Sequence, residues 1–366
     1  MLMEAPVLIK AREPMVMKEI DVDEPKAGEV RVRMVATGVC HSCLAVYNGR
    51  SSGPPKPIVL GDEGAGIVEA IGENVTIPQV GDHVVISWLL NCGHCKACMS
   101  GRPTLCRSRA PVGKLRDGTC RFHAHGTDED VYHYGPATYA PQVIVPATSA
   151  VPVRKDLPFE KAALLGCSVT TGIGSVLFTA DMSFGQSVAV FGCGGIGLNA
   201  IQAARLGGGD PIIGVDISKA ALDLAEKFGA THSVNAAKED GPAMVREITG
   251  GGVDIAVASV GNARVMEAAL TALAPGGALV IVGAPPTDDS IANIDMRFIM
   301  GGERRIIGST YGSANPAVDF PRFADLYMTG RLDLDTLVTE RYGLDEANEA
   351  FDALANGAAG RGIIAF

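Results

Sequence analysis

Residues 187–216 read SVAVFGCGGIGLNAIQAARLGGGDPIIGVD, and this stretch decides the fold. It places a short apolar strand, a glycine-rich turn, a helical segment and a second apolar strand in direct succession. Further apolar strands follow at 232–235, 254–261 and 277–285. Because these strands lack a polar face, both faces of their sheet must be covered. The alternation of strands and helices predicts a doubly wound parallel sheet.

The glycine-rich turn carries a dinucleotide fingerprint formed by Gly192, Gly194, Gly195 and Gly197. Glycine permits the tight turn, lets the backbone approach a pyrophosphate and allows close helix packing. Asp216 ends the next strand, where we expect it to accept hydrogen bonds from the adenosine ribose and to repel a 2′-phosphate. The sequence therefore predicts NAD rather than NADP; the alternative is a glycine-rich turn without a ligand.

The first half of the chain has a different pattern. Short alternating runs at 28–39, 64–72 and 81–88 are separated by turn residues, which favours a compact β-rich unit. After about residue 308 the pattern is mixed again, with an amphipathic helix around 320–329 and a closing strand at 360–366. We expect this tail to return to the β-rich unit.

Four cysteines form a dense cluster in the order Cys-x2-Cys-x2-Cys-x7-Cys, at Cys92, Cys95, Cys98 and Cys106. This spacing predicts a closed tetrahedral zinc site, which stabilises a loop and performs no chemistry. The alternative is four exposed free thiols. A redox motif would normally use a single Cys-x2-Cys pair.

Composition limits the class of protein. The chain has 366 residues, of which 47% are hydrophobic and 20% charged, enough for two ordinary cores. Its net charge of −10 disfavours nucleic acid and anionic membranes as partners and favours a small molecule. No signal peptide or run of roughly 18 apolar residues is evident. Nine clustered cysteines fit metal binding in a reducing compartment, so we expect a cytoplasmic protein.

Three separated motifs carry a family resemblance: GVCHSC around Cys40, GDEGAG around Asp62, and GCSVTTG around Cys167. With the cysteine cluster and the dinucleotide fingerprint, they resemble the zinc-dependent alcohol dehydrogenases of the medium-chain dehydrogenase/reductase superfamily. The resemblance implies an α/β protein in two domains. A GroES-like β-rich catalytic domain would comprise residues 1–168 and 311–366, and an NAD-binding Rossmann domain would comprise residues 169–310.

The resemblance also implies a catalytic zinc held by Cys40, Asp62 and Cys167, with one substitution. The family motif has histidine where this chain has Asp62. Carboxylate oxygen is an acceptable zinc ligand, but two thiolates and one carboxylate carry −3 against +2, so the metal should be a weaker Lewis acid. Cys43 replaces the Asp that supports this histidine in the family, which indicates a reorganised site. The alternative is that catalytic zinc is absent or labile.

Three neighbouring residues take catalytic roles by the same resemblance. Ser42 corresponds to the Ser or Thr that hydrogen-bonds the substrate alcohol and passes its proton outward. Glu63 corresponds to an acid just behind the metal that can approach it transiently. The family's relay histidine falls at Ala45, so His41 is considered for a partial relay role, although its position elsewhere faces cofactor phosphate.

Further assignments rest on position alone. Trp88 and Ala284 are predicted to border the substrate pocket; an aromatic at position 88 is as often core filler. Thr171 matches a position beside the nicotinamide, and Arg361 matches a contact to cofactor phosphate.

The segment 114–139 resembles a long loop of dimeric relatives and predicts a homodimer. Its three histidines, His123, His125 and His133, are predicted to be solvated loop residues without a metal role.

The resulting hypothesis is an NAD-dependent zinc enzyme that interconverts an alcohol and its aldehyde or ketone. Two enzyme alternatives keep the fold: a reductase of activated double bonds without catalytic zinc, and a dehydrogenase of a glutathione–formaldehyde adduct. The groups that would bind glutathione are not evident, since Ser51 falls near the expected acid. A catalytically silent dinucleotide-binding sensor is the alternative from another class.

Overall fold

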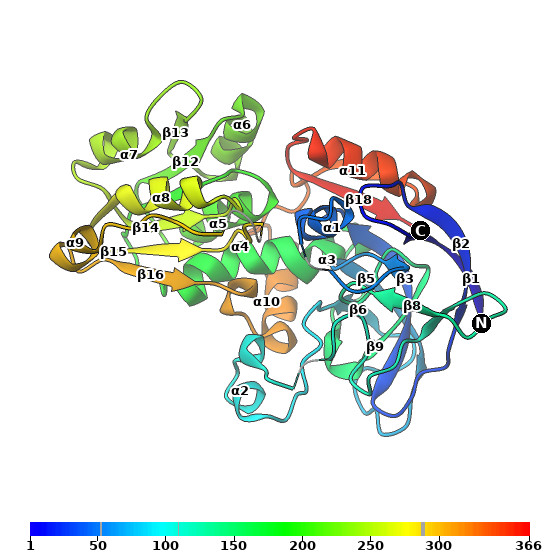
Figure 1. Ribbon diagram of the computed structural model, residues 1–366. Coiled ribbons are helices and arrows are strands. Elements are labelled where there is room, and N and C mark those ends of the chain that lie inside the picture. The colour runs from blue at the N-terminus through cyan, green and yellow to red at the C-terminus, as the bar shows by residue number, and fades with distance from the viewer. Residues whose placement is uncertain (52, 109, 287–289) are drawn as a thin grey trace. The chain divides into compact units, whose positions relative to one another are not determined.

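The computed structural model describes residues 1–51, 53–108, 110–286 and 290–366 (Figure 1). The chain divides into two compact units. Unit 1 comprises Met1–Cys167 and Asn315–Phe366, and unit 2 comprises Ser168–Ala314. The C-terminal tail therefore belongs to the same unit as the N-terminal half.

Unit 2 is built on a six-stranded sheet in which every neighbouring pair is parallel. In spatial order the strands are β13 (His232–Asn235), β12 (Ile212–Asp216), β11 (Val188–Phe191), β14 (Val253–Ala258), β15 (Leu273–Ile281) and β16 (Arg305–Gly308). The chain runs outward from β11 in both directions, which is the order of a dinucleotide-binding Rossmann sheet. This confirms the predicted fold class for the second half of the chain.

One helix precedes the first strand of unit 2, and the other helices alternate with its strands. The helices are α4 (Thr170–Gly174), α5 (Gly195–Leu206), α6 (Lys219–Phe228), α7 (Gly241–Thr249), α8 (Ala263–Thr271) and α9 (Met296–Gly301). Local signals set several boundaries: the Ser218 hydroxyl accepts from the Ala221 amide at the start of α6, and Gly229 ends that helix with a φ of 113°.

Unit 1 contains a closed five-stranded barrel and a larger sheet. The barrel strands are β1 (Leu2–Leu8), β2 (Val16–Val22), β7 (Phe122–Ala124), β8 (Asp130–His133) and β4 (Ile58–Val59). The sheet has the order β10 (Ala150–Pro152), β6 (His83–Ile86), β5 (Gly64–Ile71), β3 (Glu29–Gly38), β18 (Arg361–Ala365) and β17 (Val338–Tyr342), with β9 (Gln142–Pro146) also paired to β3. The predicted β-rich unit and its closing strand are confirmed.

The helices of unit 1 are short apart from α10. They are α1 (His41–Tyr47), α2 (Lys96–Met99), α3 (Phe159–Leu164), α10 (Pro316–Met328) and α11 (Ala347–Ala355). A π-helical turn at Leu165–Val169 follows α3 directly. The helical run Phe159–Thr179 is long and apolar enough to cross a membrane, but 83% of its apolar window is buried, as in the core helix of a globular protein.

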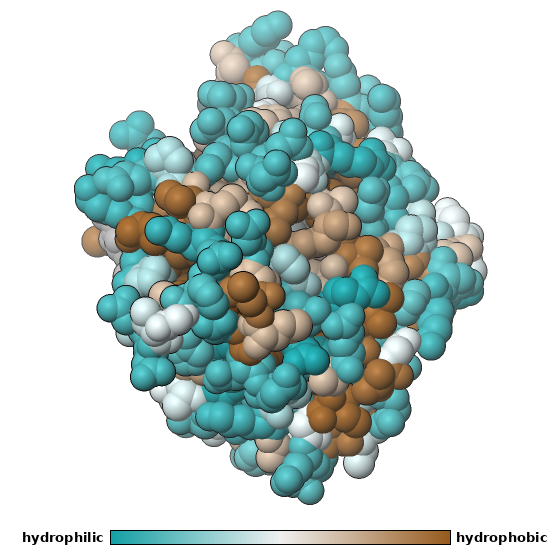
Figure 2. Space-filling view, turned by 90° about the vertical axis from the view of Figure 1, so that its right-hand side faces the viewer, coloured by the Kyte–Doolittle hydropathy of each residue, from teal (hydrophilic) through white to brown (hydrophobic). Residues whose placement is uncertain are grey.

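The side of the molecule that carries β1 and β2 is mainly hydrophilic, with separate hydrophobic patches (Figure 2). Exposed hydrophobic side chains of these strands include Leu2, Val16 and Met17, whereas Ala5, Val7 and Ile20 are buried. Isolated exposed hydrophobic residues are ordinary on folded proteins, and the buried ones form the barrel interior.

The prediction that His133 is a solvated loop residue is wrong. His133 lies in β8, is only 2% exposed, and packs its ring against Phe122 at 4.6 Å between centroids. Its Nε2 accepts a hydrogen bond from the Arg121 amide. Burial lowers the pKa of His133 to about 3, so the ring is neutral at pH 7. The prediction is also wrong for His123, which lies in β7 and is half-buried, whereas His125 is exposed in the turn after β7.

Candidate functional site

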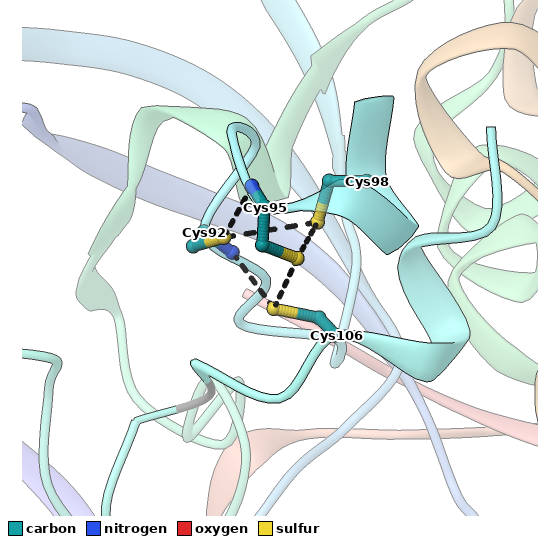
Figure 3. A group of neighbouring side chains, drawn as sticks. All are labelled: Cys92, Cys95, Cys98 and Cys106. Atoms are coloured by element: carbon teal, nitrogen blue, oxygen red, sulfur yellow. Dashed lines mark hydrogen bonds between the residues drawn. The ribbon is translucent and has the colours of Figure 1, made fainter. Parts of the chain in front are cut away.

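The four clustered cysteines bring their sulfur atoms to a common point (Figure 3). The Sγ atoms of Cys92 and Cys98 are 3.9 Å apart, those of Cys95 and Cys98 3.6 Å, and those of Cys95 and Cys106 3.8 Å. Two sulfurs bound to one tetrahedral zinc at about 2.3 Å lie about 3.8 Å apart. The spacing of the four sulfurs therefore fits a zinc ion at their centre.

The protonation of these thiols also favours a cation. The pKa of Cys95 is lowered to about 6, mainly because the Cys98 amide donates to its sulfur. The pKa of Cys98 is raised to about 11 by burial and by hydrogen bonds with neighbouring thiols. Four thiolates crowded together without a counter-ion would repel each other, and a divalent cation removes that repulsion.

A second group of possible ligands comprises Cys40, Asp62 and Cys167, all buried, with their ligand atoms within 4.8 Å of one another. Each comes from a different element. Cys40 is the N-cap of α1, two residues after the end of β3, and Asp62 lies two residues before the start of β5. Cys167 lies in the π-helical turn, a local distortion that is frequent at functional sites. Three segments separated by up to 127 residues thus converge within unit 1.

The geometry of this group fits zinc as well. The Sγ atoms of Cys40 and Cys167 are 3.9 Å apart, again close to the roughly 3.8 Å expected for two thiolates on one zinc. Burial raises the pKa of Asp62, and the Ser42 hydrogen bond and the positive charge of Arg361 oppose this rise. Two thiols and a buried carboxyl are a suitable donor set for a divalent cation, with a fourth position left for another ligand.

Two neighbours of Asp62 hold its carboxyl group. The Ser42 hydroxyl donates to Oδ2 and lies 3.0 Å from Cys40 Sγ. The buried Cys43 thiol donates to Oδ1 at 3.4 Å. Cys43 therefore contacts the substituted ligand itself, which the sequence indicated only by its position. Burial and the charge of Asp62 raise the pKa of Cys43, so the thiol keeps its proton as the donor.

Glu63 and Arg361 form a buried ion pair beside this group. Arg361 Nη2 donates to Glu63 Oε1 and lies 3.7 Å from Cys40 Sγ, while Nη1 donates to the Val39 carbonyl at 3.1 Å. Although burial opposes it, the negative charge of Glu63 raises the pKa of Arg361. A Cβ atom at Gly38 would lie 1.9 Å from Glu63 Oε2, so glycine is needed there. The role of Arg361 at a cofactor phosphate stays a prediction.

A cavity of about 190 Å³ lies in unit 1 near Asp62, and Trp88 lines it as predicted for a pocket wall. Tyr134 lines it too, and sequence reasoning missed this residue. The pKa of Tyr134 is raised by burial first and then by the charge of Asp62. Tyr134 directly follows His133, and nothing in the sequence around it signals a place at this cavity.

The dinucleotide fingerprint in unit 2 has the expected geometry. Gly192 follows β11 with a φ of 96°, and Gly194 is the N-cap of α5. A Cβ atom at Gly197 would lie 1.8 Å from the Gly192 carbonyl oxygen, whereas one at Gly194 would meet no atom of the described chain within 4 Å. Asp216 accepts from the amides of Cys193 at 2.7 Å and Ser218 at 2.8 Å. The open side at Gly194 suits the approach of a phosphate.

The other predicted residues lie in different places. His41 is exposed at the start of α1. Its pKa is lowered to about 4 by partial desolvation and by the charge of Arg361, so it is neutral at pH 7. Thr171 is buried in α4 of unit 2, and Ala284 is exposed in the same unit. Their roles beside the nicotinamide and the substrate stay predictions.

Two family models match this chain. Residues 26–155 match the alcohol dehydrogenase GroES-like domain, and residues 195–328 match the zinc-binding dehydrogenase domain. A GroES-like unit with two candidate zinc sites, together with a Rossmann sheet, defines a zinc-binding dehydrogenase.

Known proteins are similar to this chain over nearly its full length. The chain is 36% identical to an alcohol dehydrogenase class-3 of Cereibacter sphaeroides, covering 99% of each chain. It is 38% identical to an S-(hydroxymethyl)glutathione dehydrogenase of Saccharomyces cerevisiae, covering 96% of this chain and 93% of the yeast protein. The crystal structure of benzyl alcohol dehydrogenase from Acinetobacter calcoaceticus matches with a TM-score of 0.94 and 34% identity, covering 100% and 99%.

The chain belongs to the zinc-dependent alcohol dehydrogenases of the medium-chain dehydrogenase/reductase superfamily. The predicted family, fold class and enzyme class are thereby confirmed.

Proposed function

We propose that this enzyme interconverts an alcohol and its aldehyde or ketone with NAD(H), using zinc held by Cys40, Asp62 and Cys167. In this proposal unit 1 is the catalytic domain and unit 2 the NAD-binding domain. The single observation that carries the proposal is the convergence of these three buried side chains to within 4.8 Å, beside a cavity. The glycine turn and Asp216 supply the dinucleotide site.

When bound, zinc would polarise the substrate oxygen and NAD would exchange hydride with the substrate carbon. The chain's own residues do the rest. Ser42 holds the substrate hydroxyl and passes its proton outward, since its Oγ lies 3.0 Å from Cys40 Sγ. Arg361 neutralises Glu63 and faces Cys40, which limits the negative charge around the ligands. Ala45 cannot relay a proton, so His41 at the surface is the proposed exit.

The enzyme alternatives make different demands on the site. A reductase of activated double bonds without catalytic zinc needs no convergence of Cys40, Asp62 and Cys167, so the observed spacing favours the zinc enzyme. A silent dinucleotide sensor needs neither Ser42 at the ligands nor the cavity. Oxidation of a glutathione adduct uses the same chemistry with another substrate. Comparing the rate of oxidation of this adduct with that of simple alcohols distinguishes the two.

The proposal includes a homodimer in the cytoplasm. The resemblance of segment 114–139 to a loop of dimeric relatives supports the dimer. All nine cysteines are free of disulfides, which suits a reducing compartment.

The proposed function predicts two zinc ions per chain, one for each ligand group, and reduction of NAD by an alcohol. Elemental analysis of purified protein measures the zinc, and near-ultraviolet absorbance follows NADH during incubation with primary and secondary alcohols. One zinc per chain with reduction of an activated double bond would instead identify the zinc-free reductase. Two zinc ions without hydride transfer from any alcohol to NAD⁺, or from NADH to any carbonyl compound, would contradict the proposal.

Cofactor choice is predicted to depend on Asp216. In Asp216→Ala the amides of Cys193 and Ser218 lose their acceptor and the repulsion of a 2′-phosphate disappears. The variant also loses the charge-assisted hydrogen bonds that the adenosine ribose would donate to Asp216, which are worth about 1.5–3 kcal/mol. KM for NAD should therefore rise at least about tenfold, and the preference for NAD over NADP should become smaller. Asp254→Ala is the matched control, because Asp254 accepts from the Ser187 amide, beyond the opposite end of β11. Equal effects of both substitutions would refute the role of Asp216.

A further inference from the structure

The backbone that carries Asp62 is held by two buried hydroxyl groups. Thr37, near the end of β3, and Thr138, in the loop between β8 and β9, are both fully buried. The Thr37 hydroxyl donates to the Glu63 carbonyl, and the Oγ1 atoms of the two threonines lie 2.7 Å apart. Thr138 Oγ1 also lies 3.3 Å from the Glu63 carbonyl oxygen. The two hydroxyls therefore meet the residue that directly follows Asp62.

The hydroxyl protons of these threonines form a chain. Each hydroxyl has one proton to donate and can accept two hydrogen bonds. The shorter contacts are satisfied when Thr138 donates to Thr37 and Thr37 donates to the Glu63 carbonyl. That carbonyl also accepts from the Gly38 amide at 3.0 Å, so both of its lone pairs are used. The peptide group after Asp62 is thereby fixed on β3.

Thr138 holds the other side of Asp62 through its own backbone. The Thr138 amide donates to the Gly61 carbonyl at 3.1 Å. Gly61 has a φ of 117°, and a Cβ atom there would lie 2.5 Å from Thr138 Oγ1, so glycine permits this close approach. The residues before and after Asp62 are therefore both fixed by contacts with Thr37 or Thr138.

The two branches of the Thr138 side chain have different neighbours. A Cβ atom at Gly64 would lie 2.7 Å from Thr138 Cγ2, whereas one at Gly61 would lie 2.5 Å from Thr138 Oγ1. The methyl group thus packs at Gly64, and the hydroxyl lies between Gly61 and the Glu63 carbonyl. Valine would keep the packing and remove the hydroxyl, whereas serine would do the opposite.

A carboxylate ligand depends more on backbone position than an imidazole ligand does. The carboxylate oxygens of aspartate lie closer to their own Cα than the Nε2 atom of histidine does. Zinc binds oxygen and nitrogen ligands at nearly the same distance, about 2.0–2.2 Å, so the bond to the metal does not make up the difference. Ser42 and Cys43 orient the carboxyl group of Asp62 at its oxygens. The place of its Cα is set separately, by the backbone contacts on either side.

We propose that Thr37 and Thr138 are positioning residues for the catalytic metal: their linked hydroxyls fix the backbone around Asp62 so that its carboxylate reaches the point shared with the two ligand cysteines. This inference rests on the proposed function, because it takes Asp62 as a zinc ligand. Both threonines act on the metal through Asp62. Loss of a polar group that orients a metal ligand typically lowers metal affinity 10–100-fold.

The zinc affinity of Thr37→Val tests this role without turnover. Valine keeps the β-branched shape that suits a strand and removes the hydroxyl. Competition with a chelator, followed by elemental analysis, should show that the zinc ion missing from Asp62→Ala is bound about tenfold more weakly than in wild type. Thr37→Ser keeps the hydroxyl and should restore the affinity to within about threefold of wild type. Unchanged zinc affinity in Thr37→Val would overturn the proposal.

A double variant tests whether the two hydroxyls act as a pair. In Thr37→Val, the Thr138 hydroxyl still lies 3.3 Å from the Glu63 carbonyl oxygen and can donate to it. The fold-changes of Thr37→Val and Thr138→Val should therefore not multiply in the double variant. Thr138→Ala replaces Thr138→Val if the added methyl group is not accommodated beside Gly61. Fold-changes that multiply would show that the hydroxyls act independently and would overturn the linked pair.

Ser175→Ala is the matched control for the loss of a buried hydroxyl. Ser175 is fully buried in unit 2, and its hydroxyl donates to the Gly172 carbonyl at 2.7 Å. Both Ser175→Ala and Thr37→Val should lower the Tm, but only Thr37→Val should weaken zinc binding. Similar weakening in both variants would assign the effect to general destabilisation and overturn the proposal.

The Asp62→His background separates positioning from a purely structural role. Imidazole reaches further from its Cα, so Thr37→Val should weaken zinc binding in Asp62→His by less than about threefold, against about tenfold in wild type. The cost to the fold should be the same in both backgrounds. Equal weakening in the two backgrounds would show that the threonine does not act through the short reach of Asp62 and would overturn the proposal.

The zinc measurements also separate this inference from the proposed function. Weaker zinc binding in Thr37→Val, in a protein that oxidises no alcohol, would support the positioning role and contradict the proposed function. Alcohol oxidation by a protein whose zinc affinity is unaffected by Thr37→Val would overturn the positioning role alone. Wild-type protein with one zinc ion per chain, bound by the cysteine cluster, would overturn both.

Discussion

Replacing Asp62 with alanine should remove one zinc ion per chain and lower kcat/KM for alcohol oxidation by at least about a thousandfold. The variant keeps Cys40 and Cys167 but loses the third ligand atom of a group that lies within 4.8 Å. It also leaves the Cys43 thiol and the Ser42 hydroxyl without the carboxylate that they contact. Elemental analysis and steady-state kinetics measure both effects. Circular dichroism checks that the fold persists.

Asp62→His is the informative companion to this variant. Imidazole keeps three donors, so zinc should be retained. The donor charge changes from −3 to −2, which makes the site more positive and favours the deprotonated substrate hydroxyl. The pH at which alcohol oxidation reaches half its maximum should therefore move down. Unchanged zinc content in Asp62→Ala, or an unchanged pH profile in Asp62→His, would remove Asp62 from the ligand set.

A double substitution tests whether the two departures from the family pattern, Asp62 and Cys43, depend on each other. In Asp62→His the thiol of Cys43 is a poor supporter of an imidazole, because a metal-bound histidine normally donates to a carboxylate or carbonyl. Adding Cys43→Asp should therefore tighten zinc binding in the Asp62→His background. The same substitution in the wild-type background places a second buried carboxylate beside Asp62, whose Oδ1 lies 3.4 Å from the Cys43 thiol, and should weaken binding. Additive effects would show that the two positions are independent.

The sequence predicted the fold well because its signals were local. Apolar strands without a polar face, and the turn from Gly192 to Gly197, indicated a parallel sheet, and the strand order around β11 agrees. The β-rich half was predicted only as a class. Its division into a barrel and a sheet depends on pairings such as β4 with β8, which join residues about 74 positions apart, as in Ile58 with Tyr132. No local pattern specifies such pairings.

The candidate site was predictable where ligand chemistry is visible in the residue type. Cysteine spacing and the Asp62 substitution pointed to both metal groups, which the geometry brings together. Contacts set by tertiary packing were missed. Arg361 pairs with Glu63, which is 298 residues away in the sequence. A polar residue such as His133 can be buried when a backbone amide donates to it and an aromatic ring packs against it. Sequence polarity alone does not reveal such partners.

Replacing Cys106 with serine should release the other zinc ion and lower the Tm by roughly 10 °C, because structural zinc contributes on the order of 10 kcal/mol to the fold of a small metal-binding lobe. The residues between Cys92 and Cys106 form only α2 and a three-residue 3₁₀ helix, Pro103–Leu105. Neither element has enough buried apolar surface to order the lobe without a metal. Scanning calorimetry, elemental analysis and limited proteolysis at 93–105 measure the loss.

Cys120→Ser is the matched control for this prediction. Cys120 is equally buried but lies outside the cluster, and its thiol contacts the Gly113 carbonyl at 3.7 Å. We expect two zinc ions and a Tm within about 3 °C of wild type, since the substitution removes no metal ligand. The contrast separates metal loss from the general cost of a buried serine. Equal destabilisation by both substitutions, or two zinc ions retained in Cys106→Ser, would show that the lobe is held by packing and not by a metal.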